Sequence, residues 1–307
     1  MVETSPEERL KSLKKERSFI PLFPVYIKHD ILESMLPYSN WIGFNYFELR
    51  RRKFYDDVKR RGIRKTFNID DKKKIFLTST NNDKAIEKFY DHEGIVTFKS
   101  DVKAFDATMV MGPDWYIYED MNPSQRNESI EKAIRLNQEC IDLGNIVPNI
   151  HGTNPQEIGR FVEPFKAQGI NAFVMPGREY LINRYYRKRD QAKFSALTST
   201  ISRLEKIDLI VTGCSSPKLM FDLPDVSSFV SLGWLVQARC RRLIMGKTYM
   251  RILDPRFHCE DSRCCATFTK EELVKQENES FRAIHNLNKI NSQVNERSKI
   301  IQNSLVS

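Results

Sequence analysis

Short apolar runs recur along the chain, and most are followed by a segment whose apolar residues fall at helical spacing. The runs are rich in β-branched and aromatic residues and predict eight strands, over residues 19–27, 41–47, 74–80, 94–100, 114–118, 145–150, 170–175 and 208–212. Helical spacing is clearest after the fifth, sixth and seventh strands, at Ile130, Ala133, Ile134, Ile158, Phe161, Val162, Ala196, Leu197 and Ile201. Strands that alternate with helices in this way predict an α/β fold.

Eight strand–helix units favour a closed (β/α)8 barrel, a TIM-like barrel, which we expect over residues 1–253. A short helix with Ser5 as N-cap and Pro6 at its first position is expected before the first strand. The main alternative is a doubly wound open sheet, but its dinucleotide-binding form carries a Gly-x-Gly-x-x-Gly motif that is missing after the first strand here. The composition changes at Asp254, so residues 254–307 are expected to form a cysteine-containing segment and a long polar helix over about 270–303.

The composition is that of a folded chain, since 40% of the 307 residues are hydrophobic and 11% are aromatic. No apolar run approaches the roughly 20 residues that cross a bilayer, so no membrane partner is expected. The charged residues 1–17 lack the apolar core of a secretory signal, which predicts a cytoplasmic protein. Because disulfides rarely persist in that compartment, we expect the cysteines to be buried, reactive or metal-bound.

A cluster of metal-ligating residue types opens the C-terminal segment. Cys259, Cys264 and Cys265 lie close together, and His285 follows one helix later. Three thiolates and one imidazole complete a closed tetrahedral zinc site, so a structural Zn²⁺ is predicted. His258 is the alternative fourth ligand. The remaining cysteines lie in or near apolar segments and are expected to be packing residues.

The charge is basic and clustered, because 49 Lys and Arg stand against 40 Asp and Glu, giving +9 and a pI near 9.2. One cluster covers residues 50–53, 59–65 and 72–74. A second contains Arg184, Arg187, Lys188 and Arg189, with two tyrosines between the arginines. Phosphate backbones attract such clusters and aromatic faces stack on exposed bases, so a nucleic-acid partner is predicted. The alternative for any single run is a solvated helix face.

Polar residues and glycines end several of the predicted strands. Asp101 ends the fourth, Glu119 and Asp120 the fifth, His151 and Gly152 the sixth, Gly177 and Arg178 the seventh, and residues 213–216 the eighth. In a barrel the active site lies at the carboxyl ends of the strands. Carboxylates, a histidine and glycines at one rim suit acid–base or covalent chemistry on a small planar ligand. The alternative for each residue is a cap or a turn, and Asp101 has the chemistry of an N-cap.

The order of several short motifs resembles one known family. Ser100-Asp101 comes first, then Pro113-Asp114 with Asp120, the segment 146–152 ending in His151-Gly152, the segment 173–177, the segment 211–213, and the cysteine cluster before His285-Asn286-Leu287. This order resembles the tRNA-guanine transglycosylase superfamily. It is most similar to the DNA 7-deazaguanine transglycosylase branch, which lacks an appended RNA-binding domain. The resemblance covers roughly residues 96–300.

The resemblance implies a (β/α)8 barrel with a zinc subdomain and an enzyme, a pentosyltransferase, that exchanges guanine in nucleic acid for a 7-deazaguanine base. DNA is favoured over tRNA. One aspartate of the family attacks the sugar C1′ and gives a covalent intermediate, and a second handles protons. The resemblance places Asp101 in the proton-handling role and Asp120 as the base-reading carboxylate. His151 and Gly152 match the loop over the purine. Gly177 and Arg178, which end the seventh predicted strand, are further candidate substrate-binding residues.

The nucleophile segment departs from the family pattern. Relatives have Asp-x-Phe-Asp where this chain has Ser-Ser-Phe-Val at 227–230, so Asp225, or Asp222, is the candidate nucleophile. The alternative function is a catalytically silent nucleic-acid-binding subunit, in a homo- or hetero-oligomer. An unrelated metal-dependent barrel hydrolase would need several histidines at the rim, where only His151 is found.

Overall fold

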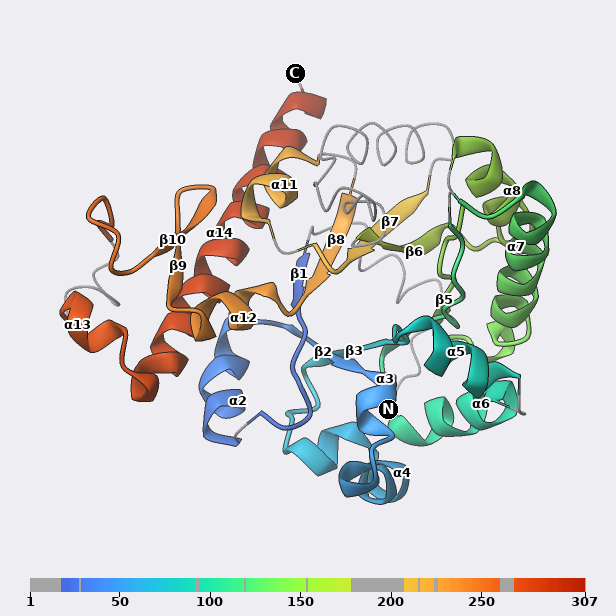
Figure 1. Ribbon diagram of the computed structural model, residues 1–307, viewed down its shortest axis with the longest axis horizontal. Coiled ribbons are helices and arrows are strands. Elements are labelled where there is room, and N and C mark those ends of the chain that lie inside the picture. The colour runs from blue at the N-terminus through green and yellow to red at the C-terminus, as the bar shows by residue number, and fades with distance from the viewer. Residues whose placement is uncertain are drawn as a thin grey trace.

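Eight parallel strands lie at the centre of the fold (Figure 1). The structure is a computed structural model that describes residues 18–27, 29–91, 94–118, 120–152, 154–177, 207–214, 216–223, 226–259 and 268–306. The strands form two four-stranded sheets, ordered β2-β3-β4-β5 and β1-β8-β7-β6. Their bounds are β1 (Ser18–Pro21), β2 (Trp41–Asn45), β3 (Lys74–Thr78), β4 (Met109–Met111), β5 (Ile146–Val147), β6 (Ala172–Pro176), β7 (Asp208–Thr212) and β8 (Val226–Ser231). The prediction of an α/β fold with parallel strands is confirmed.

Two isolated parallel bridges connect the sheets at their edges. Leu22 pairs with Gly43 of β2, and Asn149 pairs with Val174 of β6. Backbone hydrogen bonds accompany both bridges, at 2.8 Å from the amide of Phe23 to Gly43 and 2.7 Å from that of Ile150 to Val174. With these bridges, each strand from β1 to β8 neighbours the next strand in the sequence, and β8 pairs with β1.

Two apolar layers pack on the strands. The smaller cluster takes at least one side chain from every one of the eight strands: Ile20, Trp41, Phe76, Met109, Met111, Val147, Ala172, Val174, Ile210 and Val230. Neighbouring strand residues point the other way, as Phe19 and Phe173 do, and join the larger core beneath the helices. Side chains that alternate along each strand therefore fill two separate cores, one shared among the strands and one between strands and helices.

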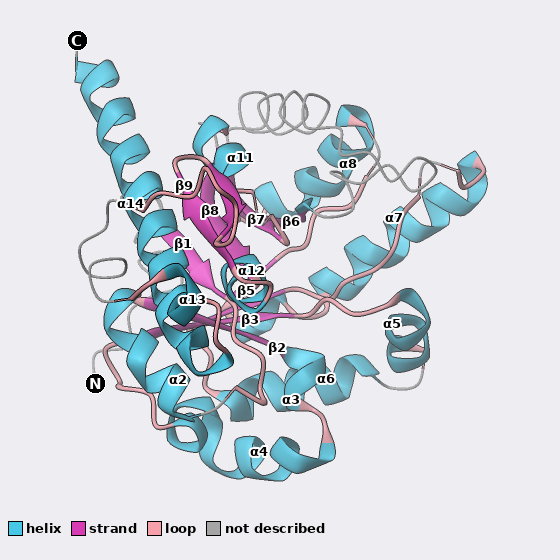
Figure 2. Cartoon of the chain, turned by 60° about the vertical axis from the view of Figure 1, so that its left-hand side comes forward, coloured by secondary structure: helices cyan, strands magenta, loops and turns pink. Residues whose placement is uncertain are grey.

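Helices surround the strands (Figure 2). Their bounds are α2 (His29–Met35), α3 (Tyr46–Leu49), α4 (Arg52–Phe67), α5 (Asp83–Tyr90), α6 (Gly94–Phe105), α7 (Pro123–Gln138), α8 (Pro155–Lys166), α11 (Pro217–Asp222), α12 (Gly233–Arg239), α13 (Lys270–Leu273) and α14 (Glu279–Val306), with short 3-10 turns at Leu36–Tyr38, Ile141–Leu143 and Gln276–Asn278. Asn122 and Asn154 cap α7 and α8, each followed by a proline whose missing N–H costs nothing at that position. No described helix is long and apolar enough to cross a membrane.

The predicted strand over residues 94–100 is wrong, because this segment is the start of helix α6. Its β-branched residues favour a strand, but its buried positions are Gly94, Phe98, Asp101, Val102 and Phe105. That spacing matches a helix, whose one face packs on the core. Asp101 therefore lies inside a helix, and its predicted position at the end of a strand is wrong as well.

The fifth predicted strand, over residues 114–118, is also wrong. The strand is β4 (Met109–Met111), three residues long, and residues 114–118 form an irregular segment after it. Strand β8 was not predicted. Its serines interrupt the apolar pattern, although Ser228 and Ser231 are buried within the strand.

The C-terminal part adds a hairpin and a long helix. β9 (Arg242–Met245) and β10 (Thr248–Arg251) pair antiparallel, and the hairpin shares a small core with Ile252, Phe257 and Leu273. Helix α14 packs against β1, α12 and β9, on the opposite side of the molecule from α7 and α8 (Figure 1). A long C-terminal helix is confirmed, but it begins at Glu279, because residues 270–278 form the separate short helix α13 and a 3-10 turn. The predicted boundary at residue 254 stays a prediction, and the predicted helices before residue 18 and over residues 196–204 lie outside the described residues.

Candidate functional site

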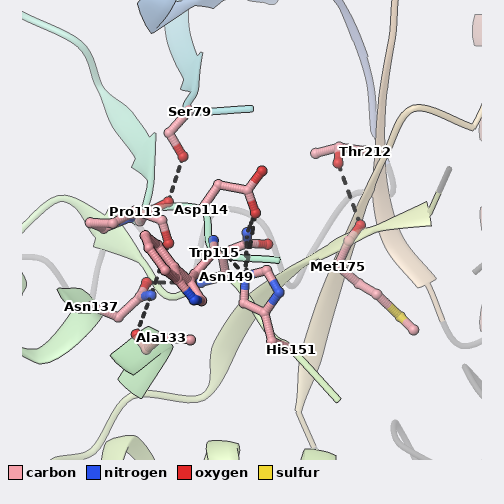
Figure 3. Close-up of polar contacts among 11 residues, drawn as sticks. Ser79, Pro113, Asp114, Trp115, Ala133, Asn137, Asn149, His151, Met175 and Thr212 are labelled. Atoms are coloured by element: carbon pink, nitrogen blue, oxygen red, sulfur yellow. Dashed lines mark hydrogen bonds and ion pairs between the residues drawn. The ribbon is translucent and has the colours of Figure 1, made fainter. Parts of the chain in front are cut away.

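Buried polar side chains converge where β3, β4 and β5 end (Figure 3). Asp114 follows β4, and Asn149 and His151 follow β5. Their side chains are almost fully buried, with residues 3%, 0% and 1% exposed. Ser79, after β3, donates a 2.5 Å hydrogen bond to the carbonyl of Gly112, which ties the first of these strand ends to the second. Adjacent parallel strands bring their carboxyl ends to one edge, so residues distant in sequence meet there.

Asp114, Asn149 and His151, here called the rim triad, are in direct contact. The amide nitrogen of Asn149 lies 2.7 Å from Oδ1 of Asp114 and 2.9 Å from Nε2 of His151. Nε2 of His151 is 3.3 Å from Oδ1 of Asp114 and accepts from the backbone N–H of Trp115 at 3.4 Å. When Asn149 donates one proton to each neighbour, Oδ1 and Nε2 face each other as two acceptors. A carboxylate and an imidazole in direct contact are the groups that general acid–base chemistry uses.

Asn137 on α7 holds the rim triad in place. Its amide nitrogen donates to the carbonyls of Pro113 (3.0 Å) and Ala133 (2.9 Å), and its Oδ1 accepts from the backbone N–H of Asn149 at 3.0 Å. Gly112 makes room for it, because a Cβ there would lie 2.0 Å from Oδ1 of Asn137. One buried amide thus joins α7 to the segments after β4 and β5. Sequence analysis missed Asn137, Asn149 and Ser79, and the available signal was polar residues inside apolar runs.

Two buried polar atoms in or beside the triad lack a hydrogen-bond partner among the described residues. One is Oδ1 of Asn149, a member of the triad, and the other is Nε1 of Trp115, the residue after Asp114. Leaving such a group unpaired costs about 1–3 kcal/mol, a cost that a bound ligand removes. One atom is an acceptor and the other is a donor.

The other predicted rim residues have different positions. Asp120 is exposed in the turn before α7, and Gly177 is buried directly after β6. Gly152 has a positive φ of 150°, and a Cβ there would lie 2.9 Å from Cγ1 of Ile158, so it permits the close approach of α8. Glu119 and Arg178 lie outside the described residues.

Asp101 is surrounded by four partners away from the rim triad. Oδ2 accepts from Tyr46 Oη (2.9 Å) and lies 3.7 Å from Nε of Arg50. Oδ1 accepts from Tyr55 Oη (2.8 Å) and lies 3.3 Å from Nζ of Lys59. Burial, together with the charge of Asp101, raises the pKa of Tyr46 far above its usual value. These contacts connect α3, α4 and α6, so Asp101 holds the helices together.

Half of the predicted zinc site is described. Sγ of Cys259 lies 3.9 Å from Nδ1 of His285, although 26 residues separate them. Nε2 of His285 lies 3.1 Å from the carbonyl oxygen of Ile244 and can only donate to it, which leaves the lone pair on Nδ1 directed towards Cys259. In tetrahedral zinc, sulfur and nitrogen ligands lie roughly 3.6 Å apart. The pair therefore fits a zinc site. His258 is exposed.

The remaining predicted ligands, Cys264 and Cys265, lie outside the described residues, which by themselves contain no group of three metal-ligating side chains. Asp225 and the basic residues Arg184, Arg187, Lys188 and Arg189 also lie outside them. Asp222 ends α11, where its Oδ1 is 3.7 Å from Nζ of Lys247.

The first basic cluster lies mainly on α4. Arg51, Lys53, Arg61 and Lys65 are exposed there, whereas Lys59 contacts Asp101. The helix therefore presents positive charge to solvent. No protein-family model matches the chain, and neither does any curated protein.

Proposed function

We propose that this chain is a base-exchanging transglycosylase that replaces guanine in nucleic acid with a 7-deazaguanine base through a covalent intermediate. DNA is favoured over tRNA as the polymer. The observation that carries the proposal is the rim triad, a buried carboxylate, amide and imidazole, in which the amide oxygen of Asn149 is unpaired among the described residues, as is Nε1 of Trp115. The motif order from Ser100 to His285 supplies the reaction class.

A (β/α)8 barrel with a C-terminal zinc subdomain is the architecture we propose. Three observations support it: the parallel neighbour order that returns to β1, the bridges at both sheet edges, and the apolar cluster drawn from all eight strands. Barrel interiors are filled in this way by side chains from every strand. On this fold the rim triad occupies the face where barrel enzymes hold their substrates.

The rim triad fits the chemistry of a departing purine. Guanine has N–H donors and oxygen and nitrogen acceptors on its edges, which match Oδ1 of Asn149 and Nε1 of Trp115. The target base must first leave the helical stack. A carboxylate oxygen then bonds to C1′ as the bond to guanine N9 breaks, and guanine takes up a proton. The incoming base later gives up a proton when its nitrogen displaces the carboxylate.

For that proton we propose Asp114 and His151 in place of Asp101. Oδ1 of Asp114 lies 3.3 Å from Nε2 of His151 and contacts no cationic side chain of lysine or arginine among the described residues, whereas both oxygens of Asp101 are occupied by tyrosines and cations. Asp225, or Asp222, remains the proposed nucleophile. Asp120, Gly152, Gly177 and Arg178 are proposed to line the base-binding side.

A structural zinc ion is proposed on Cys259, Cys264, Cys265 and His285. Bound there, it fixes the segment after β10 to α14 and takes no part in the exchange. Arg184, Arg187, Lys188 and Arg189 are proposed to contact the phosphate backbone. Cytoplasmic location remains part of the proposal.

A silent nucleic-acid-binding subunit is the second candidate. It is favoured by Asp101, whose four partners leave it a structural role although the motif order assigns it proton handling. This candidate predicts salt-sensitive binding without base release.

Release of labelled guanine distinguishes the two. Purified protein is incubated with guanine-labelled duplex DNA, and separately with tRNA, each with and without a 7-deazaguanine base. Guanine release that requires the added base and is lost in the Asp114→Asn variant supports base exchange. The nucleic acid from which guanine is released is then the substrate. No release from either, with binding retained, supports the silent subunit. Loss of a covalent adduct in Asp225→Asn or Asp222→Asn identifies the nucleophile.

A further inference from the structure

A second candidate ligand site lies on the outside of the strands, between α3, α5 and α6. It is a pocket of about 390 Å³, open to the surface and lined by Phe47, Arg50, Ala85, Lys88, Phe89 and Thr97. This volume is in the range of small-molecule sites. Among the described residues, its lining contains two aromatic rings and two cations and no carboxylate. Its chemistry selects an aromatic ligand that carries negative charge.

Arg50 is held as a rigid part of the wall. Its Nη1 donates to Oη of Tyr46 at 3.3 Å, and its guanidinium carbon lies 4.6 Å from the ring centre of Phe89. Asp101, at 3.7 Å from Nε, is completely buried beneath it. The guanidinium plane is thus positioned before any ligand arrives, which reduces the ordering cost of binding. The buried carboxylate of Asp101 therefore fixes the position of the Arg50 side chain.

Lys88 supplies charge to the same pocket. It is exposed on α5 and has no carboxylate partner among the described residues. The two acidic residues of that helix contact other side chains: Asp83 accepts from Tyr118, and Glu87 accepts from Tyr116. Asp91, which follows the helix, pairs with Lys132 at 2.7 Å. Helix α5 therefore divides its surface, with carboxylates towards the β4–α7 segment and Lys88 with Phe89 towards the pocket.

The chain continues from the pocket into the basic helix α4. Arg51 and Lys53 directly follow Arg50 and are exposed. A phosphodiester strand that places one nucleotide in the pocket can meet these cations with the neighbouring phosphates. Aromatic faces and an arginine plane bind unstacked bases without regard to sequence.

We propose that this pocket binds one unstacked nucleotide of a nucleic-acid strand, with its base on Phe47, Phe89 and Arg50 and a phosphate on Lys88. The proposal rests on the proposed function for the identity of the polymer. It adds a contact outside the rim triad that holds the strand while another base reacts.

Anisotropy of a labelled single-stranded oligonucleotide, as DNA and as RNA of the same sequence, tests the site on the full chain. Lys88→Glu and Lys88→Gln should weaken binding of the oligonucleotide, and Lys88→Arg should retain it. For Lys88→Gln, the slope of the logarithm of the binding constant against the logarithm of the salt concentration should become shallower by roughly 0.7. Phe47→Leu should weaken binding roughly fivefold or more, and this effect should vanish on a strand whose bases are removed. Lys103→Glu, at the far end of α6, is the matched charge control.

If the pocket variants lose affinity for the DNA strand alone or for the RNA strand alone, the result supports the site and identifies the polymer that it binds. Equal affinity of wild type and all pocket variants for both strands overturns it, whether or not guanine exchange is observed. If the wild type shows no base exchange but the pocket variants lose affinity for the strand, the proposed function is contradicted and the pocket assignment is supported. Binding of a free nucleoside monophosphate that is as tight as binding of the strand overturns the assignment to a polymer.

Discussion

Nε2 of His151 lies 3.3 Å from Oδ1 of Asp114, and Asn149 contacts both atoms. A carboxylate and an imidazole in direct contact can serve as general acid and general base. The pair is the structural basis for the proton handling that we propose.

Replacing Asp114 with asparagine should stop guanine release while the chain stays folded. The amide is almost isosteric but accepts less strongly and exchanges no proton, so we expect the rate to fall at least roughly 100-fold. Released guanine and the circular dichroism spectrum are measured together. Asp142→Asn, an exposed aspartate paired with Lys99 at 2.8 Å, is the control. An unchanged rate in Asp114→Asn would exclude the triad from the reaction.

Removal of the proposed zinc ligands should abolish zinc binding. Cys259→Ser and His285→Gln should each lower bound zinc, measured by elemental analysis, because each removes a bond in a closed four-ligand site. A chelator should lower the melting temperature of the wild type and have less effect on the variants. Cys240→Ser, an exposed cysteine elsewhere, should keep its zinc. A wild-type chain purified without any zinc and unaffected by zinc addition would contradict the site.

Two buried tyrosines should respond differently to loss of their hydroxyl. Tyr46 donates to Asp101 at 2.9 Å, whereas Tyr90 Oη has no hydrogen-bond partner among the described residues. At neutral pH, Tyr46→Phe should lower the free energy of unfolding by about 1–3 kcal/mol. Tyr90→Phe should leave it unchanged or raise it. Denaturant titration measures both.

The same tyrosines should make the chain sensitive to alkali. Burial raises the pKa of Tyr90 well above 10.0 in the folded chain. Above pH 10 the unfolded chain loses this proton first and binds fewer protons, so the free energy of unfolding falls as pH rises. Tyr90→Phe should flatten that fall, measured by denaturant titration on both sides of pH 10. An equally steep fall in the variant would show that Tyr90 is not responsible.

Gly152 should tolerate no side chain. In Gly152→Ala the new Cβ meets Cγ1 of Ile158 at 2.9 Å and its backbone nitrogen at 3.0 Å, at a φ of 150°. We expect a loss of about 2–3 kcal/mol in the free energy of unfolding. Gly169→Ala is the matched control, since its φ is 81° but nothing lies within 4 Å of the new atom. Gly169→Ala should lower the free energy of unfolding by about 1 kcal/mol, because only the unfavourable positive φ contributes. Equal losses would show that the contact with α8 is relaxed by a small shift.

The sequence by itself determined the α/β class, most of the strands and the long C-terminal helix. Strands β2, β3, β6 and β7 begin at or near the predicted residues because buried strands are short apolar runs that local composition reveals. Local composition misled at residues 94–100, where β-branched residues form a helix because one face, from Phe98 to Phe105, packs on the core. A packed face is a property of the neighbours, and the segment alone does not contain it.

The tertiary structure decided which candidate residues pair. His151 was predicted from its place after an apolar run, but its partner Asp114 lies on a different strand end, brought to 3.3 Å by parallel pairing of β4 with β5. The same holds for Cys259 with His285, which the spacing suggested and the packing of α14 brings to 3.9 Å. Asp101 shows the converse, since four partners from two other helices define its role. Sequence patterns report burial along the chain, whereas hydrogen bonding of a buried polar group depends on residues that only folding brings within reach.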